Sequence, residues 1–549
     1  SWSKVAVNTL DMMEKIHHNA EGDRVEMDKR PTLAFISPLP PAQSGVAIYS
    51  HYLLRELLRF YQITVISDEK EIDSEWVAGC CNVLKVDEFI QQASRFDRVL
   101  YQMGNSKFHA HMPAILDEVA GVVDMHDCYL SGMFDYLDKQ QEGAYYHALY
   151  QSHGYAGIIN ERKIERKAAI KRYSCNQSVI NKAKRLIVHS QHAVDILARN
   201  TQEIVASTAV VPLVSPPVIN MDRKSALQAL AMPDDAILVC CFGFISDQKC
   251  SATVLDVWLS IEAELQENVY LVFVGDDLYE KGLLEMVRQA PCRNKITITG
   301  FVDEKKYQQY LAVADVAIQL RQNSRGETSA AILECLANGI PLIINAHGSA
   351  IDVPAEVVVK LTEKPSVEQI AEKLLVLLSN KKERQRLKAS AQQYVKQHYH
   401  PEIVAKSYAQ EIEKAYGDNK AVAYQQLINK LAGIKQDPGG KLLCWSAVAR
   451  DVVYSTYLLK QGRLLVDVSV CNEGVEKISE DARKKLKNIL KTPTEKQRVE
   501  LVYRKDGCYW HAHELAFQIL AIPMDIMFDT PLQEMRNDRF MKLEEVGLH

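Results

Sequence analysis

The chain has 549 residues, which is too long for one hydrophobic core and predicts two or three domains. Apolar residues make up 47% and charged residues 25% of the chain, a balance that excludes an intrinsically disordered protein. The net charge is −5 without a long basic run, so the chain lacks a nucleic-acid-binding footprint, and no apolar run approaches the ~20 residues of a transmembrane helix.

The first series of predicted elements starts at Thr32. A short apolar strand at 33–36 is followed by a loop at 37–45 and by an amphipathic helix at 46–59. Further strands are predicted at 63–66, 98–101, 121–125 and 186–188. Short β-rich runs that alternate with helical stretches are typical of a parallel, doubly wound sheet.

A second series of the same kind starts near Ala236, after a proline-containing crossing at 205–217. Its strands are predicted at 237–242, 269–274, 296–299, 316–320, 341–345 and 357–361. Open α/β sheets bind ligands at the carboxyl ends of their strands. Two such sheets therefore predict a cleft between domains, lined by the loops after Phe35, Met125, Phe242, Val274 and Leu320.

The stretch 324–341 carries the strongest local signal. A polar loop that contains Gly326 runs into a helix that ends at Asn338-Gly339, before an apolar run. Free backbone N–H groups at such a helix start suit a diphosphate. Glu327 and Glu334 are about two turns apart, which places both carboxylates on one face of the helix. An ordinary capped helix between two strands is the alternative interpretation.

The chain also repeats a pattern. Residues 2–15 resemble residues 401–414, and the strand, helix and strand predicted at 464–468, 481–490 and 499–503 resemble the start of the first series. A chance similarity of amphipathic segments is the alternative explanation. If the repeat is real, the chain carries the tail of one unit, one complete unit and the first part of another.

Together these motifs resemble glycosyltransferase family 4, over roughly residues 30–417. The motifs are the loop at 44–47, the His126-Asp127 pair, the loop at 243–249, the Val-Gly-Asp at 274–276 and the stretch 324–341. The form of that last stretch resembles one unit of a multidomain bacterial O-antigen mannosyltransferase. The resemblance implies the GT-B fold, which is α/β with two facing doubly wound Rossmann-like domains, here followed by a partial α/β module.

The expected division of the chain combines the repeat with this resemblance. It runs as an N-terminal helix at 1–20, an acceptor-side domain at 30–205, a donor-binding domain at 206–400, a return helix at 401–418, a linker at 419–462 and a partial second transferase-like module at 463–549. That last module is either the opening half of another unit or an appended module that packs on the main one.

The family's donor-binding roles fall on residues of this sequence. Lys249 corresponds to the basic residue that binds the donor diphosphate, and Glu334 to the carboxylate that accepts hydrogen bonds from the nucleotide ribose. Gly45 would allow close approach of the backbone to the phosphates. The remaining implied donor contacts are Arg325, Glu327, Thr328 and Ser329.

On the acceptor side, the resemblance places His126 beside the transferred sugar, so the expected catalytic set is His126, Glu327 and Lys249. Asp127 would orient this histidine or contact the acceptor, or only cap a helix. Asn105 and His109 follow a predicted strand and are further acceptor-side candidates.

Two departures from the family pattern concern the donor site. Family members usually have two glutamates with seven residues between them; here six separate Glu327 from Glu334, and Gly326 holds the usual first position. The second glycine loop usually carries an arginine where this chain has Phe244, and Arg325 is the candidate replacement.

The leading hypothesis is a cytoplasmic retaining transferase that moves mannose from GDP-mannose onto a lipid-linked glycan, with a peripheral place at the inner face of the cytoplasmic membrane. A UDP-hexose or dTDP-rhamnose donor, and a catalytically silent GT-B module of a larger polymerase, are the alternatives. No Asp-x-Asp motif occurs, so we expect no required metal and no cofactor besides the nucleotide sugar. Other transferase domains of a longer chain and a membrane-recruiting protein are the expected partners; nucleic acid is not.

Overall fold

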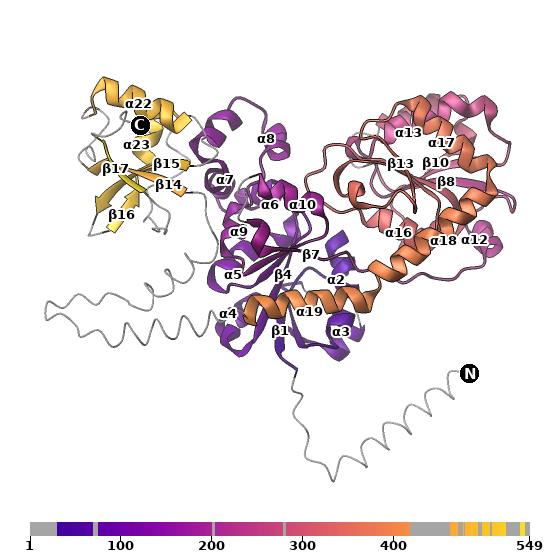
Figure 1. Ribbon diagram of the computed structural model, residues 1–549, viewed down its shortest axis with the longest axis horizontal. Coiled ribbons are helices and arrows are strands. Elements are labelled where there is room, and N and C mark those ends of the chain that lie inside the picture. Colours follow the sequence, from indigo (N-terminus) through magenta and orange to yellow (C-terminus); the bar gives the residue numbers. More distant parts are fainter. Residues whose placement is uncertain are drawn as a thin grey trace, which may run out of the picture.

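The computed structural model describes residues 30–69, 75–199, 204–277, 282–417, 462–469, 476, 478–491, 497–505, 508–522 and 539–543. The helix expected at 1–20 and nearly all of the linker expected at 419–462 lie outside these residues. Two large domains and one small module are arranged side by side (Figure 1).

The first large domain is built on seven parallel strands in the order β3-β2-β1-β4-β5-β6-β7. The strands are β1 (Thr32–Ile36), β2 (Gln62–Ile66), β3 (Asn82–Leu84), β4 (Arg98–Met103), β5 (Val122–Met125), β6 (Arg185–Val188) and β7 (Thr208–Val210). The five predicted strands are confirmed; β3 and β7 are short strands whose residues are mostly not buried, so they lack the apolar run that marks the others.

Helices connect these strands and cover the sheet (Figure 1). They are α2 (Gly45–Leu57), α3 (Glu75–Cys80), α4 (Val86–Gln92), α5 (Met112–Glu118), α6 (Ser131–Asp138), α7 (Ala144–Glu161), α8 (Arg166–Arg172), α9 (Gln177–Lys182), α10 (Gln191–Ala198) and α11 (Ile204–Ser207). The strand order reverses between β1 and β4, and a crevice at the carboxyl ends is expected at such a switch point.

The second domain repeats this topology with six parallel strands in the order β10-β9-β8-β11-β12-β13. These are β8 (Ile237–Phe242), β9 (Val269–Val274), β10 (Ile296–Ile298), β11 (Ala314–Gln319), β12 (Leu342–Asn345) and β13 (Val359–Leu361). The helices are α12 (Arg223–Ala229), α13 (Ser251–Ile261), α14 (Gly282–Gln289), α15 (Glu304–Val313), α16 (Ala330–Asn338), α17 (Val367–Ser379) and α18 (Lys381–His398). The predicted pair of doubly wound domains is therefore confirmed.

Helix α19 (Pro401–Gly417) leaves the second domain and returns to the first, where Figure 1 shows it in orange along the indigo and purple sheet. Its buried residues Val404, Tyr408 and Ile412 recur every four positions, so one stripe of the helix joins the core of the first domain. The chain thus crosses between the domains twice, and the crossings are joined by a hydrogen bond from the Ser215 N–H to the Tyr399 carbonyl (3.0 Å).

A small third sheet has the order β16-β15-β14-β17. Strands β14 (Gly462–Asp467) and β15 (Gln497–Lys505) are parallel, with α22 (Glu480–Lys491) between them in sequence, as the repeat predicts. The hairpin strand β16 (Cys508–His511) is antiparallel to β15, β17 (Arg539–Lys542) pairs with β14, and α23 (His513–Leu520) follows β16.

The module packs against α7 of the first domain (Figure 1). Buried residues of α22 and α23, among them Leu486 and Phe517, share one hydrophobic cluster with the first domain. A hydrogen bond joins Tyr155 Oη to His513 Nδ1 at 2.9 Å within this contact. The module is therefore continuous with the core of the main unit.

Candidate functional site

Helix α16 forms as its local sequence predicts. The Ser329 hydroxyl caps the start by accepting from the Ile332 N–H (3.4 Å), and the helix stops where Gly339 adopts a left-handed conformation (φ 67°). The apolar side of the helix, which includes Leu333 and Leu336, is buried in the second domain. Packing therefore fixes the helix start where the two domains meet.

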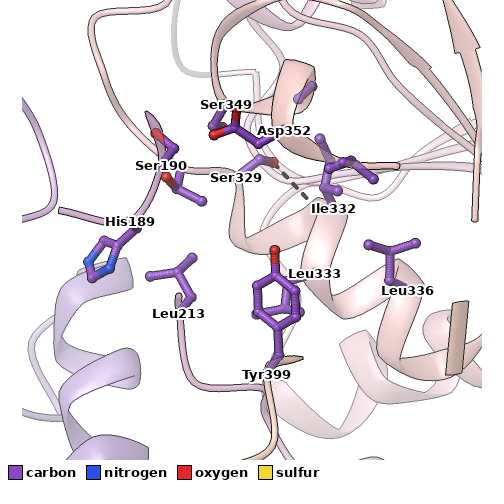
Figure 2. Close-up of a pocket in the computed structure, with 13 residues that line it drawn as sticks. His189, Ser190, Leu213, Ser329, Ile332, Leu333, Leu336, Ser349, Asp352 and Tyr399 are labelled. Atoms are coloured by element: carbon purple, nitrogen blue, oxygen red, sulfur yellow. Dashed lines mark hydrogen bonds between the residues drawn. The ribbon is translucent and has the colours of Figure 1, made fainter. Parts of the chain in front are cut away.

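Figure 2 shows a small cavity at this start, with a volume of about 40 Å³. The first domain and the crossing contribute His189, Ser190 and Leu213, and the second contributes Ser329 and Ile332 among others. Ligand pockets usually measure roughly 300–1,000 Å³. The cavity is thus a void for a few waters between closely approached domains, too small for a nucleotide sugar.

Lys249 and Glu334 come together beside α16, as predicted for a donor site. Lys249 ends a 3-10 turn (Asp247–Lys249) after β8, and its Nζ donates to the Phe242 carbonyl at 3.2 Å. Burial lowers the pKa of Lys249 to about 7, and the nearby charge of Arg321 acts in the same direction. Gly243 leaves room for this ammonium, because a Cβ there would lie 2.0 Å from Nζ.

Glu334 is partly buried on α16 and accepts a hydrogen bond from Tyr307 Oη at 2.6 Å. Burial raises its pKa to about 7, against the effect of the tyrosine hydroxyl and of Lys249. The negative charge of Glu334 thus favours the charged form of Lys249, and the positive charge of Lys249 favours the charged form of Glu334. A lowered lysine pKa and a raised glutamate pKa in the same place are typical of functional sites.

Arg321 is a basic residue near Lys249 that the sequence did not single out. It follows β11, is partly buried, and its Nη2 donates to the Ser329 hydroxyl at 2.8 Å. Its Nε has no hydrogen-bond partner, and burial lowers the pKa of the guanidinium. In the described part of the chain neither Arg321 nor Lys249 forms an ion pair within 4.0 Å, so two partly buried cations lie near each other without bound carboxylates.

Arg325, the replacement expected from the sequence, lies elsewhere. Its guanidinium is 6.0 Å from the ring centre of Tyr129 in the first domain, and its charge acts on Asp127. Arg321, whose side chain bonds to Ser329 at the start of α16 and whose charge acts on Lys249, is therefore a better-placed candidate than Arg325 for the charge missing at Phe244.

We expect Arg321→Ala to weaken nucleotide-sugar binding by about 10- to 100-fold, because a charged hydrogen bond contributes about 1.5–3 kcal/mol. Arg325→Ala removes the same charge farther from Lys249, so its effect on the dissociation constant should stay below about threefold. Calorimetric titration of both variants measures this difference. If Arg325→Ala loses more affinity than Arg321→Ala, Arg325 is the arginine that replaces the missing charge, as the sequence predicted.

The other predicted donor residues occupy the loop before α16. The Glu327 carboxylate accepts from the Arg325 N–H at 2.7 Å and so closes this loop on itself. The Thr328 hydroxyl is buried without a protein partner. Gly45 begins α2, and a Cβ there would meet no atom within 4 Å, so protein packing alone does not require glycine.

Gly326 lies where the two domains approach each other closely. Its φ is +97°, and a Cβ there would lie 2.4 Å from Cys128 Sγ of the first domain. Another contact joins the same surfaces, because Asp352 Oδ2 accepts from the Gln191 N–H at the start of α10 (2.8 Å). Where the family usually has a glutamate, this chain has the only residue type that permits such an approach.

We expect Gly326→Ala to lower kcat about tenfold with little change in donor affinity, since the added methyl group keeps the domains apart while the donor residues remain in place. Gly300→Ala is the matched control: its φ is also positive (+66°), but a Cβ there would meet nothing within 4 Å. Steady-state kinetics of both variants separate the clash from backbone strain. Equal loss in the two variants would contradict the explanation.

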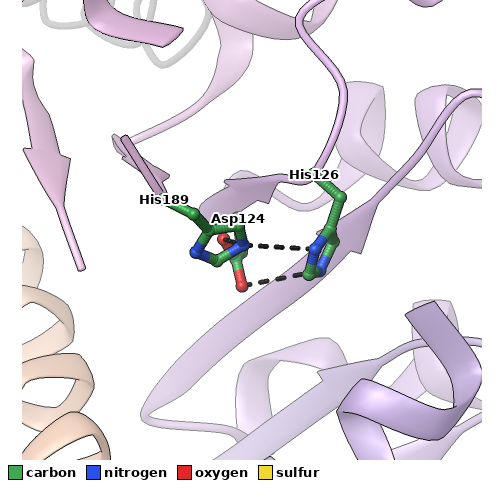
Figure 3. A group of neighbouring side chains, drawn as sticks. All are labelled: Asp124, His126 and His189. Atoms are coloured by element: carbon green, nitrogen blue, oxygen red, sulfur yellow. Dashed lines mark hydrogen bonds and ion pairs between the residues drawn. The ribbon is translucent and has the colours of Figure 1, made fainter. Parts of the chain in front are cut away.

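His126, the predicted catalytic histidine, has both ring nitrogens engaged within the first domain (Figure 3). Nε2 lies 2.8 Å from Gln102 Oε1, and Nδ1 lies 3.1 Å from His189 Nε2. Burial, followed by the charge of His189, holds the pKa of His126 well below its ordinary value. In this conformation the ring offers no nitrogen to a substrate, so a role in proton transfer is disfavoured.

The remaining acceptor-side candidates are also held by protein contacts. Asp127 accepts from the Asn105 N–H at 3.0 Å, and burial raises the pKa of Asp127 to about 6, with Glu327 across the interface adding to it. Asn105 Oδ1 accepts from the Met133 N–H (2.9 Å). His109 is buried and burial lowers its pKa to about 4, which indicates a structural residue.

Within the described ranges one group of side chains, Asp124, His126 and His189, is close enough to hold a metal ion. Each ring nitrogen of the two histidines has a hydrogen-bond partner in the protein. His189 Nδ1 faces the Val211 carbonyl at 2.9 Å, His126 Nε2 faces Gln102, and the two rings face each other (Figure 3). We therefore treat the group as a hydrogen-bond network. No helix among the described residues is both long and apolar enough to traverse a bilayer.

Comparison with known proteins agrees with this architecture. Residues 222–394 match the family model described as Glycosyl transferases group 1. The search of curated proteins gives no significant match.

Among solved structures, WaaG, a glycosyltransferase involved in lipopolysaccharide biosynthesis, is 14% identical, with 69% of this chain and 99% of that chain covered and a TM-score of 0.50. A glycosyltransferase from Rickettsia africae is 11% identical (71% and 100% covered, TM-score 0.52). Anabaena HepE in complex with UDP-glucose is 14% identical (70% and 100% covered, TM-score 0.50).

At these identities the structural likeness establishes the fold, which is the GT-B arrangement of two facing Rossmann-like domains. The matched residues 222–394 contain Lys249, Arg321 and Glu334, three charged groups of the second domain whose pKa values are shifted by burial. The fold and the match to the group 1 glycosyl transferases together support a glycosyltransferase.

Proposed function

We propose that this protein is a retaining glycosyltransferase that moves a hexose from a nucleoside-diphosphate sugar onto a growing lipid-linked surface glycan. The observation that carries the proposal is the pair of partly buried cations, Lys249 and Arg321, which lie beside the start of α16 without a carboxylate partner among the described residues. Buried charges are costly unless they are paired. A diphosphate supplies the missing negative charge, and Glu334 lies beside it to accept hydrogen bonds from ribose hydroxyl groups.

Catalysis in this proposal is mainly electrostatic. The two cations and the first turn of α16 stabilise the charge that develops on the leaving diphosphate. A phosphate oxygen of the leaving group accepts the proton of the attacking acceptor hydroxyl, so no protein nucleophile is needed. Lys249 is thus the catalytic residue best supported by position, and Glu327 acts through the loop that it closes.

Mannose from GDP-mannose and an acceptor of the O-antigen type remain our leading choices of substrate, on the resemblance of the stretch 324–341. The HepE complex holds UDP-glucose, which keeps a UDP-hexose as the second candidate. WaaG acts in lipopolysaccharide biosynthesis, which is compatible with a surface-glycan acceptor. We place the protein in the cytoplasm, next to the membrane that carries its acceptor and the partner proteins that recruit it.

The test is transfer by the purified chain from GDP-mannose, UDP-glucose and dTDP-rhamnose to a short mannose acceptor, with product linkage determined by NMR. Transfer from GDP-mannose alone, with retained configuration and in the presence of EDTA, supports the proposal. Transfer from another donor changes the sugar but not the reaction. No binding of any donor would instead favour a catalytically silent module.

A further inference from the structure

Both crossings between the domains are tied to the substrate-facing edge of the first domain. His189 Nδ1 lies 2.9 Å from the carbonyl of Val211, the residue where the first crossing begins. Tyr408 of α19, just after the second crossing, donates its hydroxyl hydrogen to Asp124 Oδ2 at 2.5 Å. Asp124 and His189 end neighbouring strands, β5 and β6, and both lie next to His126 (Figure 3).

The hydrogen-bond partners fix the protons of this network. Both the Val211 carbonyl and Gln102 Oε1 are acceptors, so the facing ring nitrogens, His189 Nδ1 and His126 Nε2, are donors. The remaining nitrogen of His189 lies 3.1 Å from His126 Nδ1 and 3.3 Å from Asp124 Oδ1, both of which are acceptors. His189 therefore faces His126 and the buried Asp124 side chain with the same ring nitrogen.

Tyr408 joins a third element to the network. Its hydroxyl also lies 2.7 Å from the hydroxyl of Tyr49 on α2, the helix that follows the loop at 44–47. The Tyr49 ring meets the His126 ring edge-on, with centres 4.9 Å apart. Tyr408 and Asp124 are fully buried, and Tyr49 is partly buried beside them. One tyrosine of the return helix thus contacts groups from two elements at this edge.

We propose that Tyr408 and Asp124 are positioning residues, which hold the loop of His126, Asp127 and Cys128 where the second domain closes against it. The loop begins two residues after Asp124 and ends at Cys128. Cys128 is the residue on which Gly326 of the second domain packs. The effect on turnover rests on the proposed function; the effect on the loop does not. Loss of the Tyr408 hydroxyl should release the loop from α19 without changing Lys249, Arg321 or Glu334.

The experiment compares Tyr408→Phe with Tyr61→Phe in the full chain. Tyr61 is a matched control, because it is equally buried and its hydroxyl also bonds to α19, at Glu413 (2.9 Å), but it has no contact with Asp124 among its hydrogen bonds described here. Asp124→Asn, which keeps the shape but not the charge, is the second test variant. Thermal unfolding, hydrogen–deuterium exchange of residues 126–131 and steady-state kinetics are measured for each.

Tyr408→Phe and Asp124→Asn should speed exchange of 126–131 and lower kcat about tenfold, because a misplaced cleft loop impairs alignment of the reactants. Their KM for the donor should change less than about twofold, since the donor residues are untouched. Tyr61→Phe should alter only thermal stability. Wild-type exchange in Tyr408→Phe, or an equal loss of kcat in Tyr61→Phe, overturns the proposal. If the wild type uses none of the three donors, the proposed function fails and the exchange data alone decide the positioning role.

Discussion

Glu334→Ala is expected to weaken nucleotide-sugar binding by about 100-fold, since each hydrogen bond to a carboxylate contributes about 1.5–3 kcal/mol and two ribose hydroxyl groups can donate. The loss also removes the acceptor for Tyr307 Oη and the negative charge nearest Lys249. Calorimetric titration with GDP-mannose and UDP-glucose measures the dissociation constants. Glu334→Gln, which keeps one acceptor oxygen, should fall between wild type and alanine.

The control for this variant is Glu304→Gln. Glu304 is exposed at the start of α15 and contributes to the raised pKa of Glu334, but it makes no direct contact with the proposed ribose position. Its replacement should leave donor affinity within about twofold, as for most exposed charges. Wild-type affinity in Glu334→Ala would remove Glu334 from the donor site.

Donor binding is expected to be strongest near pH 7 and weaker on both sides. Burial lowers the pKa of Lys249 to about 7, so its positive charge is present below pH 7 and is lost as the pH rises. Burial raises the pKa of Glu334 to about 7, so its negative charge is lost as the pH falls. Dissociation constants measured from pH 5.5 to 8.5, about 1.5 units on either side of these values, should trace both limbs.

Lys249→Gln should remove the alkaline limb and lower kcat about 100-fold, because a cation that stabilises a developing charge contributes about 2.7–4 kcal/mol in comparable sites. A bound diphosphate raises the pKa of Lys249, so wild type should take up a proton on binding at pH 8. Calorimetry in two buffers with different ionisation enthalpies detects that proton. Lys305→Gln, on the exposed side of α15, is the control.

A proton uptake that persists in Lys249→Gln would assign the alkaline limb to another group. An unchanged kcat in this variant would show that Lys249 binds ground state and transition state equally. Either result leaves Arg321 as the remaining partly buried cation at the start of α16.

Local sequence was sufficient for most of the fold because buried parallel strands are short apolar runs and helices have recognisable ends. Helix α16 is the clearest example: a serine cap, an apolar face and a left-handed glycine define it within ten residues. Lys249 and Glu334 could be singled out as candidates for the same reason, since each lies within a short motif. The three-residue strands β3 and β7 carry no such pattern and depend on pairing with their neighbours.

The sequence by itself thus determined two doubly wound domains and the motifs at their strand ends. Only the tertiary structure decided which side chains meet: Arg321 follows β11 and reaches Lys249 after β8, because these strands are neighbours in the sheet despite their separation in the chain. Tyr408 bonds to Asp124 across 284 residues, and both nitrogens of His126 turn to protein partners. Such contacts follow from strand order and from the return of α19, which no local pattern of residues specifies.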